Sequence, residues 1–170
     1  NYANSPLAQD PGAINQDDAK ADPRQARNIN KQFNAGEELE QGRVGVFFTK
    51  KFLARHRFSV RSYAGRRFFD NRLAFQPGGI VELERSFFGI RLNVEFQNRL
   101  LRLPWKSSIG IDIESQSDRR QRYDNLDGLP GLLVFDMDES FSGTGFYFIQ
   151  QLQATDRLTL ALGLRFDRVN

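Results

Sequence analysis

The chain has 170 residues, of which 39% are hydrophobic, and its 24 basic and 21 acidic side chains give a formal net charge of +3. This mixed charge argues against a general nucleic-acid binder, which needs a concentrated basic surface. The absence of cysteine excludes a disulfide scaffold and a thiolate metal site. No run of about 18 apolar residues is present, so any membrane crossing is expected to use strands rather than helices.

Residues 1–41 are rich in Asn, Asp, Gln, Ala and Pro and show no sustained hydrophobic period. We expect one long loop over this range, extracellular if the chain is part of a membrane barrel. A short helical turn between Asp17 and Lys31 is possible, but Pro23 keeps any helix there brief. The strands of the domain are expected in residues 42–170.

From residue 42 onward, apolar side chains alternate with polar ones, which is the pattern of extended strands. The clearest strand is the last, where every second residue from Leu158 to Phe166 is apolar while Arg165 and Asp167 lie on the other side. The expected strands come in three pairs, 43–52 with 57–68, 86–97 with 105–117, and 140–152 with 157–169.

The connections between these strands alternate in length. Short turns are expected at 53–56, 98–104 and 153–156, and long polar connections at 69–84 and 118–138. Short turns at one end and long loops at the other are typical of outer-membrane barrels, whose strands need about 9 to 11 residues to cross. We therefore predict an all-β fold, an antiparallel up-and-down transmembrane β-barrel that is incomplete, with about six strands of a larger barrel. A soluble or small β-barrel ligand-binding protein is the alternative, since soluble strands also alternate.

The end of the sequence also carries a family motif. After a strand rich in aromatic and Gln residues, the chain continues D-R-L-T-L-A-L-G-L-R-F-D from Asp156 to Asp167. This resembles the D-R-L-T-L-x-x-G-L-R-[FY]-D pattern of TonB-dependent outer-membrane receptors. Residues 4–12, 26–37 and 122–125 resemble loop segments of the iron-complex receptors in that family.

The resemblance implies a barrel of about 22 strands closed around a plug domain in the bacterial outer membrane. Such receptors import iron-siderophore complexes, or a similar scarce nutrient such as cobalamin, into the periplasm. The implied partners are outer-membrane lipid and lipopolysaccharide, the iron-siderophore ligand, and the TonB complex through the plug. The sequence shows neither a plug nor enough strands to enclose a lumen, so we expect it to be part of such a receptor and to transport nothing alone.

Charged side chains recur on the polar side of the predicted strands. An Arg facing lipid at mid-bilayer would cost roughly 2 to 4 kcal/mol, so this side is expected to face the lumen, with opposite charges pairing between neighbouring strands. Contact with the plug or the ligand is the second possibility. The lumen-facing candidates are Arg91, Glu95, Asp112, Glu114, Arg165 and Asp167.

Ligand capture is expected in the long connections. Guanidinium groups bind carboxylates through two hydrogen bonds, and an aromatic ring can stack on a planar chelator. Surface arginines that meet only water or lipopolysaccharide phosphate are the other interpretation. The ligand-binding candidates are Arg119, Arg120, Arg122 and Tyr123 in one connection, and Arg66 and Arg67, beside Phe68 and Phe69, near the other.

Enzymatic interpretations find little support. His56 is the only histidine and lies in a predicted short turn, away from the long connections. Asp112 and Glu114 share one strand face about 7 Å apart, but nothing positions a substrate there. Phosphate-loop, dinucleotide-binding and zinc-site spacings are missing. We therefore expect no catalytic residues, no metal site and no cofactor.

Overall fold

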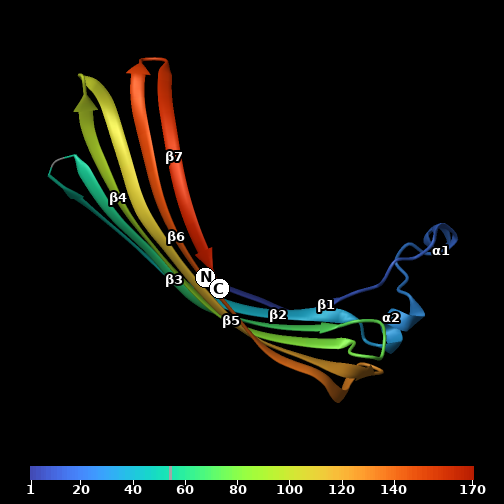
Figure 1. Ribbon diagram of the computed structural model, residues 1–170. Coiled ribbons are helices and arrows are strands. Elements are labelled where there is room, and N and C mark those ends of the chain that lie inside the picture. Colours follow the sequence, from blue (N-terminus) through green and yellow to red (C-terminus); the bar gives the residue numbers. More distant parts are fainter. Residues whose placement is uncertain (54) are drawn as a thin grey trace. The chain divides into compact units, whose positions relative to one another are not determined.

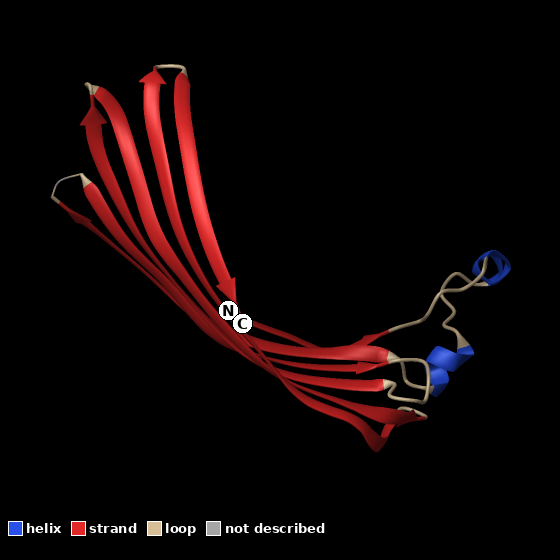
Figure 2. Ribbon diagram, viewed as in Figure 1, coloured by secondary structure: helices blue, strands red, loops and turns tan. Residues whose placement is uncertain are grey.

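The computed structural model describes residues 1–53 and 55–170. Within that part, the chain is almost entirely strand, and both helices lie in the connection between the first two strands (Figure 2). In chain order the elements are β1 (Tyr2–Gln9), α1 (Gln16–Ala21), α2 (Asn28–Gln32), β2 (Gly36–Phe52), β3 (His56–Arg72), β4 (Ile80–Leu100), β5 (Leu103–Leu126), β6 (Leu129–Thr155) and β7 (Leu158–Val169) (Figure 1). None of the described helices is long and apolar enough to cross a membrane.

The described strands form one seven-stranded sheet, in which the spatial order from β1 to β7 is the order along the chain. β1 pairs antiparallel with β2, and β6 pairs antiparallel with β7. Strands that lie in the sheet in their order along the chain, each antiparallel to the next, form the up-and-down arrangement. The predicted all-β, antiparallel fold is therefore confirmed, with one strand more than the six expected.

The chain divides into two compact units. Unit 1 comprises Asn1–Arg43, Gly65–Ser86 and Ser117–Glu139, and unit 2 comprises Val44–Ala64, Phe87–Gln116 and Ser140–Asn170. Strands β2 to β6 contribute residues to both units. Unit 1 contains both helices and the β3–β4 and β5–β6 connections, whereas unit 2 contains the other three hairpin turns and β7.

The period-2 pattern of unit 2 fixes which side chains meet across strands. In the β6–β7 register, Phe148 lies opposite Leu164 and Leu152 opposite Leu160, so apolar side chains share one face. Tyr147 lies opposite Arg165 on the other face. Cross-strand pairs of two apolar or two polar side chains stabilise an antiparallel ladder. This register therefore keeps the apolar side chains of β6 and β7 on one face and the polar ones on the other.

Short turns join all three predicted strand pairs, although the last one lies slightly further along the chain than the predicted 153–156. β2 ends at Phe52 and β3 begins at His56, and two-residue turns at 101–102 and 156–157 join the other two pairs. Ala54, part of the first predicted turn, lies outside the described residues.

The predicted long connections are wrong. β3 continues to Arg72 and β4 begins at Ile80, so only residues 73–79 connect them. The range 118–138 is not a loop, because β5 and β6 continue through it to a two-residue turn at Asp127 and Gly128. In the β5 extension, charged side chains lie on both faces and the hydrophobic period is absent, whereas the β4 and β6 extensions keep a short alternation, such as Leu133, Phe135 and Met137 with Asp136 and Asp138.

The amino-terminal range is also more ordered than the single loop that the sequence predicts. β1 pairs with β2 from Tyr2, opposite Gly42, to Gln9, opposite Gly36. The expected helical turn is present as α1 and α2, with Pro23 between them. Asn15 caps α1, since its side-chain oxygen accepts the N–H groups of Asp17 and Asp18 at 3.0 and 2.8 Å.

Buried side chains are few and mostly polar. Among the described residues, the buried hydrophobic side chains are Ala35 and Ile80, both in unit 1. The buried polar side chains are Asn30, Glu95, Ser107, Asp112, Asp118 and Asn125. The ladder of backbone hydrogen bonds and the polar contacts between strands, rather than a large apolar core, therefore hold these units together.

Candidate functional site

Unit 2 has one face covered with exposed apolar side chains. Leu158, Leu162 and Phe166 of β7 all point to this face, and Phe166 is 68% exposed. Contiguous apolar surface on this scale marks a contact with lipid or with another protein. Other exposed members of this face are Val44, Val46, Phe48, Phe88, Ile109, Phe146, Phe148, Leu160 and Leu164.

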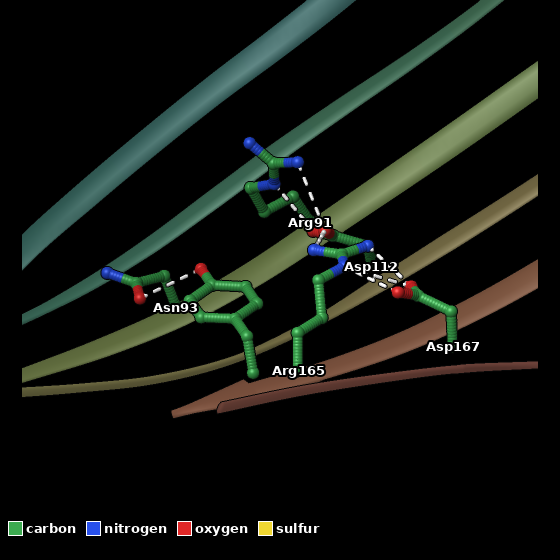
Figure 3. Close-up of polar contacts among 6 residues, drawn as sticks. Arg91, Asn93, Asp112, Arg165 and Asp167 are labelled. Atoms are coloured by element: carbon green, nitrogen blue, oxygen red, sulfur yellow. Dashed lines mark hydrogen bonds and ion pairs between the residues drawn. The ribbon is translucent and has the colours of Figure 1, made fainter. Parts of the chain in front are cut away.

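The opposite face of unit 2 carries a network of charges centred on Asp112 of β5 (Figure 3). Arg91 of β4 donates from Nη2 to Asp112 Oδ2 at 3.1 Å, and from Nε to Oδ1. Arg165 of β7 donates from Nη1 to the same Oδ2 at 2.8 Å, and its Nη2 lies 2.7 Å from Asp167 Oδ1. The Asp112 side chain is only 8% exposed, because both guanidinium groups cover it.

The contact between Arg165 and Asp112 requires a glycine in β6, the strand that lies between them. β6 lies between β5 and β7, so Arg165 must cross β6 to reach Asp112. It crosses at Gly145, where a Cβ atom would collide with the Arg165 guanidinium and the Asp167 carboxylate. The glycine at this position is therefore explained by close approach of neighbouring side chains.

Two tyrosine rings on this face also lie against a glycine of a neighbouring strand. The ring of Tyr147 lies over Gly110 of β5, and its hydroxyl donates to Asn93 Oδ1 at 3.0 Å. The ring of Tyr63 on β3 lies over Gly89 of β4. Both rings lie across a neighbouring strand, so they fix the spacing of the strands and cover the polar face.

The predicted lumen-facing residues are largely brought together. Arg91, Asp112, Arg165 and Asp167 form the network, and Glu95, which is buried, pairs with Lys106 Nζ at 2.7 Å. Glu114 is exposed and forms no ion pair with another described residue. That all six face a lumen stays a prediction.

The predicted ligand-binding residues of 119–123 lie in a strand, not at a loop tip. Because they are consecutive in β5, Arg119 and Tyr123 point to one face and Arg120 and Arg122 to the other. Arg119 pairs with Asp136 at 3.4 Å and Arg120 with Glu139 at 3.3 Å, while Arg122 is exposed. The structure therefore does not gather them into one cluster.

Arg66 and Arg67 are likewise neighbours in a strand, β3, and point to opposite faces. Arg66 is exposed. The Arg67 guanidinium lies 5.6 Å from the centre of the Phe69 ring, within the range of a cation–π contact.

One polar pair was missed by the sequence analysis. Arg85 of β4 donates through Nε and Nη2 to Asp118 of β5 at 2.8 and 2.6 Å. Both residues have the same strand parity as Arg91 and Asp112, so extending the period-2 pattern by six residues along each strand would have identified them. Both residues lie outside or at the edge of the ranges in which the apolar alternation is unbroken, so that pattern does not single them out.

Asn125, which is fully buried, was also missed as a structural residue. Its side-chain Nδ2 donates to the carbonyl oxygens of Phe33 and Leu73, each at 3.0 Å, and its Oδ1 accepts the N–H of Gly128 at 2.7 Å. It thus joins the end of α2, the β3–β4 connection and the β5–β6 turn of unit 1.

Acidic side chains line a cavity of about 340 Å³ in unit 1, which also contains Phe68 and Leu83. Burial raises the pKa values of the Asp70 and Glu82 carboxyl groups above their ordinary values, although nearby Arg72 opposes this. In the part of the chain that the structure describes, no group of three or more His, Asp or Glu side chains is placed to hold a metal ion.

His56 packs between two aromatic rings in unit 2. Its ring centre lies 5.5 Å from that of Phe52 and 5.3 Å from that of Phe96. Its Nδ1 accepts the backbone N–H of Gln97 at 3.3 Å. This position gives the histidine a packing role at the end of the apolar face.

Comparison with known proteins finds a solved structure with a similar fold. No protein-family model matches the sequence. The chain is similar to the ferric citrate transporter FecA in its unliganded form, with a TM-score of 0.78 and 15% sequence identity over 94% of this chain. The match covers 24% of the transporter chain, so this chain spans about a quarter of its length. The likeness shows the fold: the chain has the architecture of part of that transporter's barrel, an incomplete antiparallel up-and-down β-barrel.

Proposed function

We propose that the chain forms part of the wall of a TonB-dependent receptor in the bacterial outer membrane, which imports iron-siderophore complexes or a similar scarce nutrient such as cobalamin. The fold shared with a ferric citrate transporter supports this proposal, as does the D-R-L-T-L-A-L-G-L-R-F-D motif of 156–167. The observation that carries it is the separation of the two faces of unit 2, with exposed hydrocarbon on one and paired charges on the other.

In this proposal the strands of unit 2 cross the membrane. Its apolar face meets lipid, since hydrocarbon side chains on β7 gain nothing from exposure to water. The face of Arg91, Asp112 and Arg165 meets the aqueous lumen or the plug, because charges at mid-bilayer depth are costly. The strand segments of unit 1 lie outside the bilayer, as they carry charges on both faces, such as Arg119 and Arg120 of β5.

Uptake measurements on cells that make the natural protein test this function. Deleting its gene should lower uptake of radioactive iron supplied as ferric citrate or as a ferric siderophore, or uptake of cobalamin. Collapsing the inner-membrane proton gradient should lower uptake equally, because TonB-dependent transport draws on it. Restoring the gene is the control. Unchanged uptake of all three nutrients, or a protein recovered outside the outer membrane, would contradict the proposal.

We further propose that the arginines of 119–122 and 66–67 contribute to ligand binding on the extracellular side. Arg122 and Arg66 are exposed, which leaves them accessible to an anionic iron chelate. Replacing Arg119, Arg120 and Arg122 together by Gln should weaken binding of ferric citrate or a ferric siderophore at the cell surface. Arg24→Gln, in the connection before α2, is the matched control. Unchanged binding in the triple variant would remove this segment from the ligand site.

A further inference from the structure

The three hairpin turns of unit 2, which lie at one end of its strands, concentrate basic residues. The ranges 50–57, 98–106 and 153–157 hold eight Lys and Arg side chains but one acidic side chain, Asp156. Unit 2 as a whole has twelve basic and five acidic residues, so these turns supply most of its positive charge. The basic residues are Lys50, Lys51, Arg55, Arg57, Arg99, Arg102, Lys106 and Arg157.

Two of these turns also break the usual residue preferences. Leu53, Leu101 and Arg102 have φ angles of +47°, +50° and +71°, in the left-handed region that favours Gly, Asn and Asp. The β5–β6 turn of unit 1 has similar angles, +52° and +90°, and uses the expected pair Asp127 and Gly128. Local turn chemistry therefore does not account for leucine at these positions.

Burial does not account for the leucines either. Leu101 is 89% exposed and Leu53 is 79% exposed, the two highest values among the exposed large hydrophobic side chains of residues 1–53 and 55–170. Residues that violate both a backbone preference and burial commonly serve a contact outside the folded chain. An apolar environment beyond the turns would explain both leucines.

The neighbouring cations are available for an anion. Arg55, Arg99 and Arg102 form no ion pair with another described residue, whereas Lys106 is held by Glu95. Arg55 and Arg99 line a cavity of about 400 Å³ near the ends of the strands, together with Trp105 and polar side chains such as Lys106 and Gln151, and no carboxylate of the described residues lines it. Free guanidinium groups bind phosphate through paired hydrogen bonds.

We propose that these turns form a binding surface for anionic phospholipid. The Leu53 and Leu101 side chains enter the boundary between headgroups and acyl chains, and Arg55, Arg99 and Arg102 bind the headgroup phosphates. The inference rests on the proposed function, in which the apolar face of unit 2 contacts lipid. It favours lipid over an acidic protein because two strongly exposed leucines, Leu53 and Leu101, lie in the same turns as these cations.

Aromatic residues mark this boundary. On the apolar face, Phe52 and His56 flank the β2–β3 turn, and Phe96 and Trp105 lie near the β4–β5 turn. Trp105 donates from its indole nitrogen to Gln150 Oε1, which satisfies its one polar group. Aromatic side chains with a polar edge are enriched at the interface between hydrocarbon and water. At these two turns, the order of apolar strand, aromatic ring and basic turn matches the successive layers of a bilayer leaflet.

Native mass spectrometry of the purified natural protein, titrated in detergent with phosphatidylglycerol or phosphatidylcholine, tests the charges. The double variant Arg55→Gln and Arg102→Gln should lower the affinity for phosphatidylglycerol by about tenfold or more, since each cation near an anionic surface contributes roughly a fivefold effect. Binding of phosphatidylcholine should change little. The control variant, Arg24→Gln with Lys31→Gln, removes two exposed cations elsewhere and should retain phosphatidylglycerol binding. Equal loss in both double variants, or loss in neither, would overturn the proposal.

The variant Leu101→Gly separates lipid binding from turn geometry. Glycine adopts positive φ freely, so the variant should unfold at an equal or higher temperature, yet bind both lipids more weakly because the apolar side chain is gone. Leu101→Asn repeats the test with another residue that tolerates this conformation. Unchanged lipid binding in both variants would contradict a membrane contact.

Two further outcomes would assign the surface differently. If inorganic phosphate displaces phosphatidylglycerol fully, the turns hold a phosphate site and the lipid assignment is wrong. If the double variant loses a copurifying acidic protein and keeps the lipid, the surface is a protein interface. The proposed function is contradicted if the natural protein is not found in the outer membrane. If the protein is found there but its variants bind lipid normally, only the inference about these turns is contradicted.

Discussion

At the scale of single residues, the buried Asp112 is the centre of the charge network on the polar face of unit 2. It accepts hydrogen bonds from guanidinium groups on two other strands, β4 and β7. The carboxylate is buried, but Arg91 and Arg165 are each about half exposed, at 51% and 48%. If the carboxylate is removed, water can therefore hydrate the two guanidinium groups and replace part of the lost hydrogen bonding.

Replacing Asp112 by Asn should lower the free energy of unfolding by about 2 kcal/mol, because two charge-assisted pairs are lost and their partners are only partly rehydrated. Denaturant titration of the natural protein in lipid vesicles measures this change. Glu114→Gln, on the same face of the same strand but without an ion pair, should stay within about 0.5 kcal/mol of the natural protein. Equal effects of the two substitutions would show that the network does not stabilise the wall.

Asp70 gives unit 1 a pH dependence of stability. Burial raises the pKa of its carboxyl group above the unfolded value of 3.8. Between the unfolded and folded pKa values the native state binds more protons, so its contribution to stability is largest below 3.8 and falls as the pH rises through the folded pKa. Asp70→Asn should therefore stabilise the protein at pH 7, and the gain should disappear below the unfolded pKa.

Unfolding titrations at pH 3.5 and pH 7 distinguish this effect from a general change in charge. Asp156→Asn, at an exposed turn, is the control. Its effect on the free energy of unfolding should be about the same at both pH values. A destabilised Asp70→Asn variant at pH 7 would mean that the ion pair with Arg72 at 3.4 Å outweighs burial.

At the scale of elements, the sequence predicts the strands wherever one face is apolar. In β4, β5 and β7 of unit 2 the alternation identifies the strands and the residues of both faces, including the charged residues that pair. It fails where β5 continues into unit 1, because charge on both faces removes the period, and it fails in β6, where the short alternation of Leu133, Phe135 and Met137 lies in a range predicted as a loop. It fails again at β1, where Pro6 lies at an irregularity of the register between Ser5 and Ala8. A proline, which has no N–H to donate, fits such an edge position but disguises the strand in the sequence.

The partners that hold the elements of unit 1 together could not be predicted from local pattern. Asn125 bonds to Phe33 and Leu73, which are 92 and 52 residues away. Such contacts depend on how the strands are ordered, which the sequence pattern does not specify. In contrast, the Arg91–Asp112 pair of unit 2 joins neighbouring strands and follows from their parity, whereas the Arg165–Asp112 pair crosses β6 and also depends on Gly145.

Asn125→Ala should release three elements at once. The carbonyl oxygens of Phe33 and Leu73 and the N–H of Gly128 would lose their partner, at a cost of about 3 kcal/mol for buried groups. Hydrogen exchange should then accelerate in α2, in residues 73–79 and at the β5–β6 turn. Asn98→Ala, an exposed position, should leave these rates unchanged. Unaltered protection in the Asn125 variant would contradict its joining role.

At the scale of the whole molecule, the account depends on which environment each face of unit 2 meets. The fold is that of part of a transporter barrel, and its strands carry hydrocarbon on one side and an ion-pair network on the other. A soluble ligand-binding barrel would reverse these environments, with the leucines of β7 turned toward an interior ligand. The two possibilities predict opposite surroundings for adjacent residues of one strand.

The most direct test places nitroxide labels on successive residues of β7, at cysteines introduced for Leu160, Ala161 and Leu162. The described chain contains no free cysteine, so it adds no background label. In the natural protein reconstituted into vesicles, labels at 160 and 162 should be accessible to oxygen, which concentrates in lipid, and shielded from a water-soluble nickel complex. The label at 161 should show the reverse. Equal accessibility along β7, or nickel accessibility at 160 and 162, would contradict a lipid-facing wall.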